Sequence, residues 1–415
     1  MTTSHGATGP HVLRQINERA VLDRLRAAGA LRLSDLAQAT GLSRPAVSRA
    51  ISSLREAGWV EDTDEPERGR GRPAQRVRFR AERGHVLGID AGPHKVRVLV
   101  ADLAGRAVAD HRIENTSGRW AAVDVLAAIT RCSDEALARA LLRRSDVWSI
   151  GVGTPGIVDE PSGTVRLAPS IRGWAGLPVG QELRDRFDCP VHVDNEANLS
   201  ALAERWTGVA RESRNMVFVQ WGARIGLGIL IGGKVHPGSA SGAGELGFAD
   251  LIAPLDTDDD LPPAPAEPGD GMGAFERLVG ASAILDIAVD EARRSGDEAF
   301  RLALTTPDQP RNAAAFFTAA ARGDNEAAVR TLERVAARFA RGIAVAALVL
   351  DPDLIVIGGG VSRCGAPLLD AVERHLRPRL LTTPRLEMSA LGDSSVAIGG
   401  IRRALDEVEA EQAPA

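Results

Sequence analysis

The first eighty residues carry apolar positions three or four apart in three short blocks, separated by polar residues. This spacing predicts three amphipathic helices. The apolar blocks are residues 21–28, 36–37 and 47–54, and the glycines that follow them are Gly29, Gly41 and Gly58. Ser34 and Ser43 precede the second and third blocks and can cap the N-termini of those helices. Because only residues 40–43 separate these two helices, we predict a helix-turn-helix.

The third predicted helix has one apolar face and one face of hydroxyl and arginine side chains. Such side chains reach base edges and phosphates in a DNA major groove. A solvated face is the alternative for one amphipathic helix, but the two preceding helices and the short turn favour DNA binding. The candidate DNA-binding residues on this helix are Ser43, Arg44, Pro45, Ser48, Arg49, Ser52 and Arg55.

Two short apolar segments, residues 59–60 and 77–79, flank a stretch rich in arginine and glycine. They predict the β-hairpin of a winged helix. Arg70 and Arg72 alternate with glycines, and this pattern fits the narrow, electronegative minor groove of DNA. A solvated linker is the alternative. We therefore assign residues 11–80 to a winged helix-turn-helix DNA-binding domain that includes these two arginines.

From residue 84 onward, short apolar strands are separated by amphipathic helices. An actin-like (ribonuclease H-like) ATPase lobe begins with three strands, a helix and a fourth strand, and the predicted elements follow this order. The later predicted strands suit a second lobe. We expect an α/β fold with two lobes around a cleft. The predicted lobes are residues 84–198, completed by residues 395–410, and residues 199–394. The predicted strands are residues 85–90, 95–102, 108–113, 147–152, 191–193, 216–221, 227–231 and 354–357; the predicted helices are residues 121–143 and 312–350.

Length and charge support two or three domains with different partners. The 415 residues exceed one small core. Residues 11–80 hold 14 arginines against nine acidic residues, whereas the whole chain has a net charge of -5. A basic head on an acidic body suggests that the head meets a polyanion. Pairing two heads in a symmetric homodimer or homotetramer would double the surface that contacts double-stranded DNA.

Cysteine use and hydropathy indicate a cytoplasmic protein. The three cysteines are far apart and odd in number, so they form neither a disulfide framework nor a paired metal motif. The first ten residues contain no apolar segment of a signal peptide, and no stretch approaches the ~18 apolar residues of a membrane span. We expect no membrane partner.

Six glycine-rich or acidic motifs in the body occur in the order found in one family. The chain resembles the ROK family (repressor, open reading frame, kinase), and its winged head makes it similar to the repressors of that family. Any one motif is weak, but six in order are specific. The motifs are Gly88–Gly92, Gly151–Gly156, Asp194–Asn198, Gly244–Gly247, Gly273–Glu276 and Ile355–Ser362.

The resemblance also shows where the kinase chemistry has changed. Kinases of this family cradle ATP with Asp-x-Gly-Gly-Thr-Lys and Gly-Thr-Gly turns. Here Pro93 and His94 interrupt the first turn, and Ala223 and Arg224 the second. The catalytic aspartate is replaced by Glu196, which is one methylene longer, and ~1 Å of misplacement can cost ~100-fold in rate. We expect no catalytic residue, with Glu196 a degenerate base, no cofactor, and no enzyme activity.

The zinc site usual in the family is also altered. Its histidine position is occupied by Phe248, and its cysteine positions by Glu267, Gly269 and Ala274. Zinc in such sites requires nitrogen and sulfur ligands. We predict no structural metal.

The family's sugar contacts, carried over by position, suggest a remaining effector site. Carboxylates and amides suit a polyol, and Arg224 leaves room for an anionic ligand such as a sugar phosphate. The candidate ligand-binding residues are Ser170, Asn195, Glu196, Glu245, Phe248 and Glu276. We therefore predict a transcription regulator, a repressor, that responds to a sugar or sugar derivative. The alternatives are a sugar kinase with a DNA-binding head and a DNA-binding protein with no effector.

Overall fold

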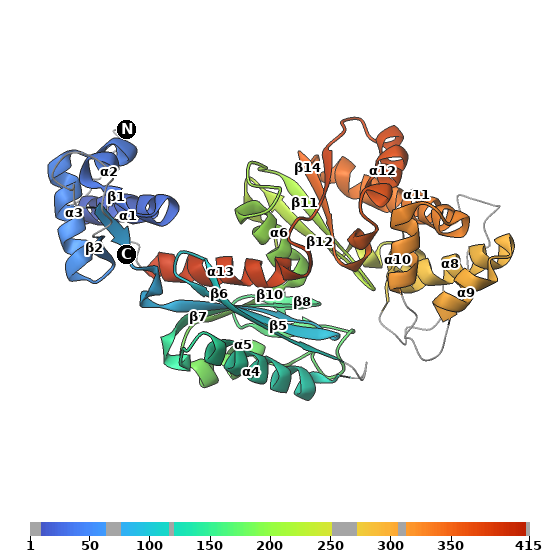
Figure 1. Cartoon of the computed structure of the whole chain (residues 1–415), viewed down its shortest axis with the longest axis horizontal. Helices are drawn as coiled ribbons and strands as arrows, with labels where there is room; N and C mark the ends of the chain where they lie inside the picture. Colours follow the sequence, from blue (N-terminus) through green and yellow to red (C-terminus); the bar gives the residue numbers. More distant parts are fainter. Residues whose placement is uncertain (1–9, 64–75, 116–119, 251–271, 306–312, 412–415) are drawn as a thin grey trace, which may run out of the picture.

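The computed structural model describes residues 10–63, 76–115, 120–250, 272–305 and 313–411. Arg70, Arg72, Glu267 and Gly269 lie outside these ranges. Figure 1 shows three units in a row: the head at one end, a first sheet with its helices in the middle, and a second sheet with its helices at the other end.

The head is a winged helix with a three-stranded sheet. Its elements are α1 Pro10–Ala28, β1 Leu31–Arg32, α2 Leu33–Thr40, α3 Arg44–Glu56, β2 Val60–Thr63 and β3 Arg76–Phe79, with sheet order β1-β3-β2. Ser43 caps α3, since its side chain accepts a hydrogen bond from the backbone of Ala46. The predicted cap at Ser34 was wrong: α2 already begins at Leu33, without a side-chain cap. The reason is that β1 pairs with β3 up to Arg32, so the chain turns directly from strand into helix.

The middle unit, here called lobe 1, is a five-stranded sheet with helices on both faces. Its strands are β4 His85–Ala91, β5 Lys95–Asp102, β6 Ala107–Glu114, β7 Val147–Thr154 and β10 Val191–Asn195, in the order β10-β7-β4-β5-β6. Helices α4 Ala122–Arg139 and α5 Val179–Phe187 cover one face, and α13 Ser395–Glu411 lies across the other (Figure 1). A hairpin of β8 Ile157–Asp159 and β9 Thr164–Leu167, with the short η1 Ala81–Arg83 and η2 Arg144–Asp146, completes the unit. Helix α6 Glu196–Trp206 lies between the two units, packed against α13 on one side and against β11 (Met216–Trp221) and β12 (Ile225–Ile231) of the second sheet on the other.

The second unit, lobe 2, repeats the five-stranded plan. Its sheet order is β13-β12-β11-β14-β15, with β11 Met216–Trp221, β12 Ile225–Ile231, β13 Lys234–Val235, β14 Leu354–Gly358 and β15 Arg385–Met388. Its helices are η3 Leu246–Phe248, α7 Ala274–Val279, α8 Ala281–Ser295, α9 Glu298–Thr305, α10 Ala313–Arg322, α11 Glu326–Leu350, η4 Gly360–Cys364, α12 Ala366–Leu376, η5 Arg377–Arg379 and η6 Gly392–Ser394.

One predicted helix, residues 312–350, is two helices in the structure. Gly323 ends α10 in the left-handed conformation, with φ +69°, and the side chain of Asn325 caps α11 by accepting from the amide of Ala328. The apolar period continues through both helices, so periodicity alone could not locate the break. Within the described ranges, no helix combines the length and apolarity needed to cross a bilayer.

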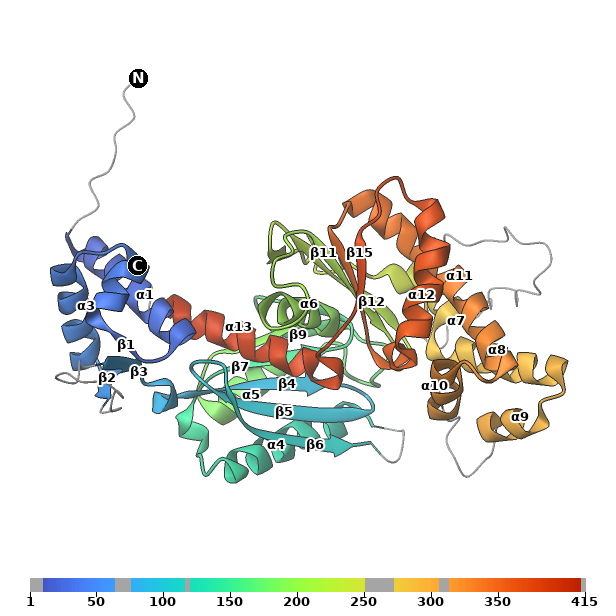
Figure 2. The same cartoon turned by 45° about the horizontal axis from the view of Figure 1, so that its top comes forward.

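Helix α13 packs closely on the first sheet because glycines meet at the contact. A Cβ at Gly151 would lie 2.1 Å from the carbonyl oxygen of Gly400, and one at Gly88 1.9 Å from that of Ala397. Figure 2 shows the same helix running from this contact to the head. There Ile401 and Leu405 belong to one buried apolar cluster with head residues such as Leu25 and Ile51. The head and lobe 1 therefore share a core.

Candidate functional site

The polar face of α3 is open to solvent along its whole length. Its apolar residues are buried in the core of the head, which turns the opposite face outward. All seven predicted DNA-binding residues of this region are exposed: Ser43, Arg44, Pro45, Ser48, Arg49, Ser52 and Arg55. Arg55 also forms an ion pair of 2.7 Å with Asp62 of β2, which ties the end of α3 to the wing. The predicted minor-groove residues Arg70 and Arg72 lie outside the described residues.

Two adjoining cavities lie between the lobes. The smaller, of about 50 Å³, is lined by all six predicted ligand-binding residues: Ser170, Asn195, Glu196, Glu245, Phe248 and Glu276. The larger, of about 810 Å³, lies on the side where kinases of the family hold ATP and includes Asp90, Lys95 and Ser395. Ser170, Glu196 and Arg224 line both cavities, so the two form one divided cleft.

The six predicted ligand residues are not equally available to a ligand. The side chain of Asn195 donates to the carbonyl of Gly156 at 2.8 Å and accepts from the amide of Ala197 at 2.7 Å, where it caps α6. Glu276 is 2% exposed and accepts from the amides of Ile225 and Gly273 at 3.0 and 2.9 Å. The polar atoms of these two side chains already bond to other protein atoms, so Asn195 and Glu276 form part of the cavity wall and are less available to a ligand.

The other two predicted ligand carboxylates, Glu196 and Glu245, lie in surroundings that disfavour their ionised forms. Burial, and then the negative charge of Asp90, raise the pKa of Glu196 to about 7. Burial, followed by the charge of Glu276, also raises the pKa of Glu245. A carboxyl that titrates near neutrality can donate or accept a hydrogen bond, which suits a hydroxylated ligand. Phe248 is 44% exposed and adds an apolar face to the same cavity.

The nucleotide side of the cleft does not fit a phosphate cradle. The amide of Gly92 donates to the carbonyl of Lys95, and that of Gly222 to the carbonyl of Arg224, both at 3.0 Å within their own turns. Pro93 has no amide hydrogen to offer. Arg224 reaches across to Glu276 at 3.4 Å and occupies the second turn.

Sequence reasoning missed several charged residues that line the larger cavity. Lys95 pairs with Asp90 at 3.2 Å, and Arg363 with Asp393 at 3.2 Å. Arg112 lies 3.8 Å from the same Asp393 carboxylate. Arg363 could have been found, since it follows the turn after β14, and the carboxyl ends of sheet strands are where ligands bind in α/β folds.

The family's zinc site does not fit the residues present. Phe248 and Ala274 stand at two ligand positions and offer no nitrogen or sulfur. Over the part of the chain that the structure describes, no three histidine, cysteine or acidic side chains gather in a metal-binding cluster.

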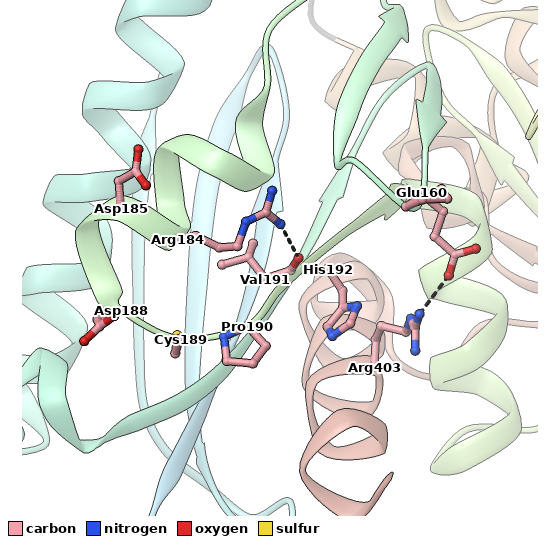
Figure 3. Close-up of a pocket in the computed structure, with 10 residues that line it drawn as sticks. Glu160, Arg184, Asp185, Asp188, Cys189, Pro190, Val191, His192 and Arg403 are labelled. Carbon is pink, nitrogen blue, oxygen red and sulfur yellow. Dashed lines mark hydrogen bonds and ion pairs between the residues drawn. The ribbon is translucent and has the colours of Figure 1, made fainter. Parts of the chain in front are cut away.

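A separate cavity of about 1030 Å³ lies at the β10 edge of lobe 1 (Figure 3). None of the predicted site residues lines it. Both arginines in its wall bond to neighbouring protein atoms: Arg403 pairs with Glu160 at 2.8 Å, and Arg184 donates to the carbonyl of Val191 at 3.3 Å. Burial lowers the pKa of His192 in its wall, with Arg403 adding to the effect.

Comparison with known proteins matches both parts of the chain. A family model described as ROK family matches residues 86–406, and a MarR family model matches residues 15–71. A putative xylose repressor from Caldicellulosiruptor sp. (strain Rt8B.4) is 26% identical over 96% of this chain and 98% of its own length. A glucokinase from Halalkalibacterium halodurans is 29% identical over 76% of this chain and 93% of its own.

Solved structures show the same architecture. A ROK family transcriptional regulator, a homologue of the E. coli MLC protein, covers 97% of this chain and 99% of its own, with 23% identity and a TM-score of 0.74. A ROK family glucokinase from Streptomyces griseus, in complex with glucose and AMPPNP, covers 78% of this chain and 100% of its own, with 25% identity and a TM-score of 0.66. The predicted fold, a winged helix before a two-lobed sugar-kinase-like body, is confirmed. Because the family model spans most of the sequence, this chain belongs to the ROK family.

Proposed function

We propose that this protein is a DNA-binding transcription regulator, a repressor, whose affinity for DNA responds to a small sugar-like effector in the cleft. The observation that carries the proposal is the exposed α3 face on a winged helix, joined to a body with a divided cleft. The xylose repressor match covers the head as well as the body, whereas the glucokinase match spans less of the chain. Such a regulator acts in the cytoplasm, as a homodimer or homotetramer on double-stranded DNA.

We assign residues 11–80 to DNA binding, and residues 84–198 with 395–410, and 199–394, to the two lobes. In this division the carboxylates that face the effector come from both lobes, Glu196 from lobe 1 and Glu245 from lobe 2. A ligand that contacts both would favour a closed cleft, and it can shift DNA affinity only by its different affinities for the two states.

The lining of the cleft indicates the kind of effector. Glu196 and Glu245 suit vicinal hydroxyls, while the exposed ring of Phe248 suits an apolar or acyl group on the ligand. The smaller cavity holds roughly the volume of one or two waters. A sugar derivative must therefore extend past Arg224 into the larger cavity, where an anionic group would meet that guanidinium.

We propose that the protein has no sugar-kinase activity. The turns at Gly92 and Gly222 use their amides internally, and Arg224 occupies the second turn. A coupled assay with Mg-ATP and a panel of sugars tests this directly. Phosphorylation of any sugar above the background of heat-treated protein would favour the alternative, a kinase with a DNA-binding head.

We also propose that the protein holds no structural metal. Elemental analysis that finds one zinc per chain would contradict this expectation.

DNA selection from a random duplex library tests the regulatory function. The expected result is enrichment of a two-fold symmetric site whose affinity falls with salt, because cationic side chains on the head release counterions from phosphates. No enrichment would refute the proposal.

A thermal-shift screen of sugars, sugar phosphates and acylated sugars then tests the effector. A true effector stabilises the wild type, changes its affinity for the selected site by ~5–150-fold, and loses both effects in Glu245→Ala. A ligand that stabilises both proteins equally binds elsewhere. No hit would favour a DNA-binding protein without an effector.

A further inference from the structure

An aromatic and cationic cluster joins the head to lobe 1 at the strand that leads to the cleft. We call Trp59, Arg83 and Trp148 the clamp. Trp59 lies between α3 and β2, Arg83 ends η1, and Trp148 is the second residue of β7. The rings of Trp59 and Trp148 meet edge to face with centroids 5.6 Å apart, and the Arg83 guanidinium lies 4.5 Å from the Trp59 ring and 5.6 Å from the Trp148 ring.

Two features of the backbone, a β-bulge and a glycine, position the Trp148 ring. The register between β4 and β7 pairs His85 with Val147 and Val86 with Ser149, so Trp148 is the extra residue of a β-bulge. A bulge re-aims the side chain it carries. Gly84 leaves the space for that ring, since a Cβ there would lie 2.4 Å from the Cε2 atom of Trp148.

The clamp also contacts the C-terminal end of α3. Arg83 donates a hydrogen bond to the carbonyl of Ala57, the residue that caps the C-terminus of α3. At the other side of the head, Arg19 donates to the carbonyl of Glu409 at 3.1 Å, and Arg26 lies 3.6 Å from the Glu409 carboxylate near the end of α13. The head is thus held on lobe 1 at two separate places.

Strand β7 connects the clamp with the cleft. Its seven residues from the bulge at Trp148 to Thr154 span about 20 Å, and Thr154 precedes the cleft residue Pro155. Thr154 is buried and accepts a hydrogen bond from the indole of Trp174 at 2.8 Å. One extended strand in a packed sheet therefore links a wall of the cleft to the base of α3.

We propose that Arg83 and Trp148 are positioning residues that fix the head at one angle on lobe 1, and so set the spacing at which a dimer presents its two α3 helices to DNA. The proposal rests on the regulatory function and symmetric pairing proposed above. It predicts that the clamp governs half-site spacing and contributes little to the recognition of a single half-site, because none of its residues lies on the exposed α3 face.

The experiment compares full-length wild type with Arg83→Ala, Trp148→Ala and Gly84→Ala on three duplexes. These are the selected operator, the same operator lengthened by about half a helical turn (~5 bp), and a single half-site. Arg131→Ala is the matched control, since Arg131 is an exposed arginine on α4, away from the head. Trp148→Phe is the conservative variant, which retains an aromatic ring facing Trp59.

We expect the clamp variants to bind the single half-site within about twofold of wild type, but to reduce the ratio of affinities for the selected and lengthened operators by about fivefold or more. Trp148→Phe should recover part of that ratio, and Arg131→Ala should leave it unchanged. An unchanged ratio in the three variants overturns the proposal. So does an equal loss on all three duplexes, since that is the effect of a destabilised head. A wild type that selects no operator refutes the regulatory function itself.

Discussion

At the scale of single residues, Glu196 is a carboxyl held in an environment that opposes its charge. Burial and the neighbouring Asp90 raise its pKa to about 7, whereas an unfolded glutamate titrates near ~4.3. At a pH between these two pKa values, the folded protein holds a proton on Glu196 that the unfolded chain has lost. The free energy of unfolding therefore falls as the pH rises from about 4.3 to about 7. Above this range, the ionised carboxylate destabilises the fold by a constant amount.

Replacing Glu196 with glutamine should remove this pH dependence. We expect Glu196→Gln to unfold like wild type below pH 4.5 and to be more stable at pH 8, by on the order of 1–3 kcal/mol. Thermal unfolding from pH 4 to 8 measures the difference, with the exposed Glu212→Gln as control. A constant offset between Glu196→Gln and wild type across this range would show that the carboxyl is not perturbed.

Arg44 is the first residue of α3, where recognition helices meet base edges. We expect Arg44→Ala to weaken binding to the selected operator by about 1–3 kcal/mol while leaving thermal stability unchanged, because the side chain is exposed. Fluorescence anisotropy with operator and unrelated DNA measures the change. Arg24→Ala, an exposed arginine on α1 of the same head, is the control; equal losses in both variants would indicate only a general effect of charge.

At the scale of elements, the contact between α13 and the first sheet depends on backbone approaching backbone. Gly151→Ala would place a Cβ 2.1 Å from the Gly400 carbonyl oxygen, and neither backbone can move without separating helix from sheet. We expect a loss of about 3 kcal/mol in the free energy of unfolding, measured by urea titration. Gly360→Ala is the control, since a Cβ there meets no atom within 4 Å. Equal stability of the two variants would contradict the close contact.

At the scale of the whole molecule, the shared core predicts that damage to α13 reaches the head. Ile401 is 2% exposed in the cluster that also contains head residues, whereas Leu368 is buried in the core of lobe 2. Each substitution to alanine should cost about 2–5 kcal/mol. Hydrogen exchange should then speed up in α1–α3 for Ile401→Ala but not for Leu368→Ala. Unchanged exchange in the head of Ile401→Ala would mean that the head folds independently of lobe 1.

The sequence by itself determined the elements whose cause is local. The helical period, the cap at Ser43 and the left-handed glycine Gly41 specify the helix-turn-helix, and strands such as Lys95–Asp102 match their predicted bounds. The family resemblance gave the candidate ligand residues by position, four of them within the six motifs, and all six line one cavity. These features depend on neighbours in the chain or on motifs, so one sequence suffices to predict them.

Only the tertiary structure decided which of those residues have polar atoms already bonded and how the parts are joined. Asn195 and Glu276 match the family's positions, yet their partners, such as Gly156 and Ile225, lie 39 and 51 residues away in sequence. The packing of the head on lobe 1 through Arg83 and Trp148 also could not be predicted, because no periodic pattern in the sequence marks these two residues as neighbours. Contacts between distant segments arise from packing and loop closure, and no local pattern of apolar and polar positions encodes them.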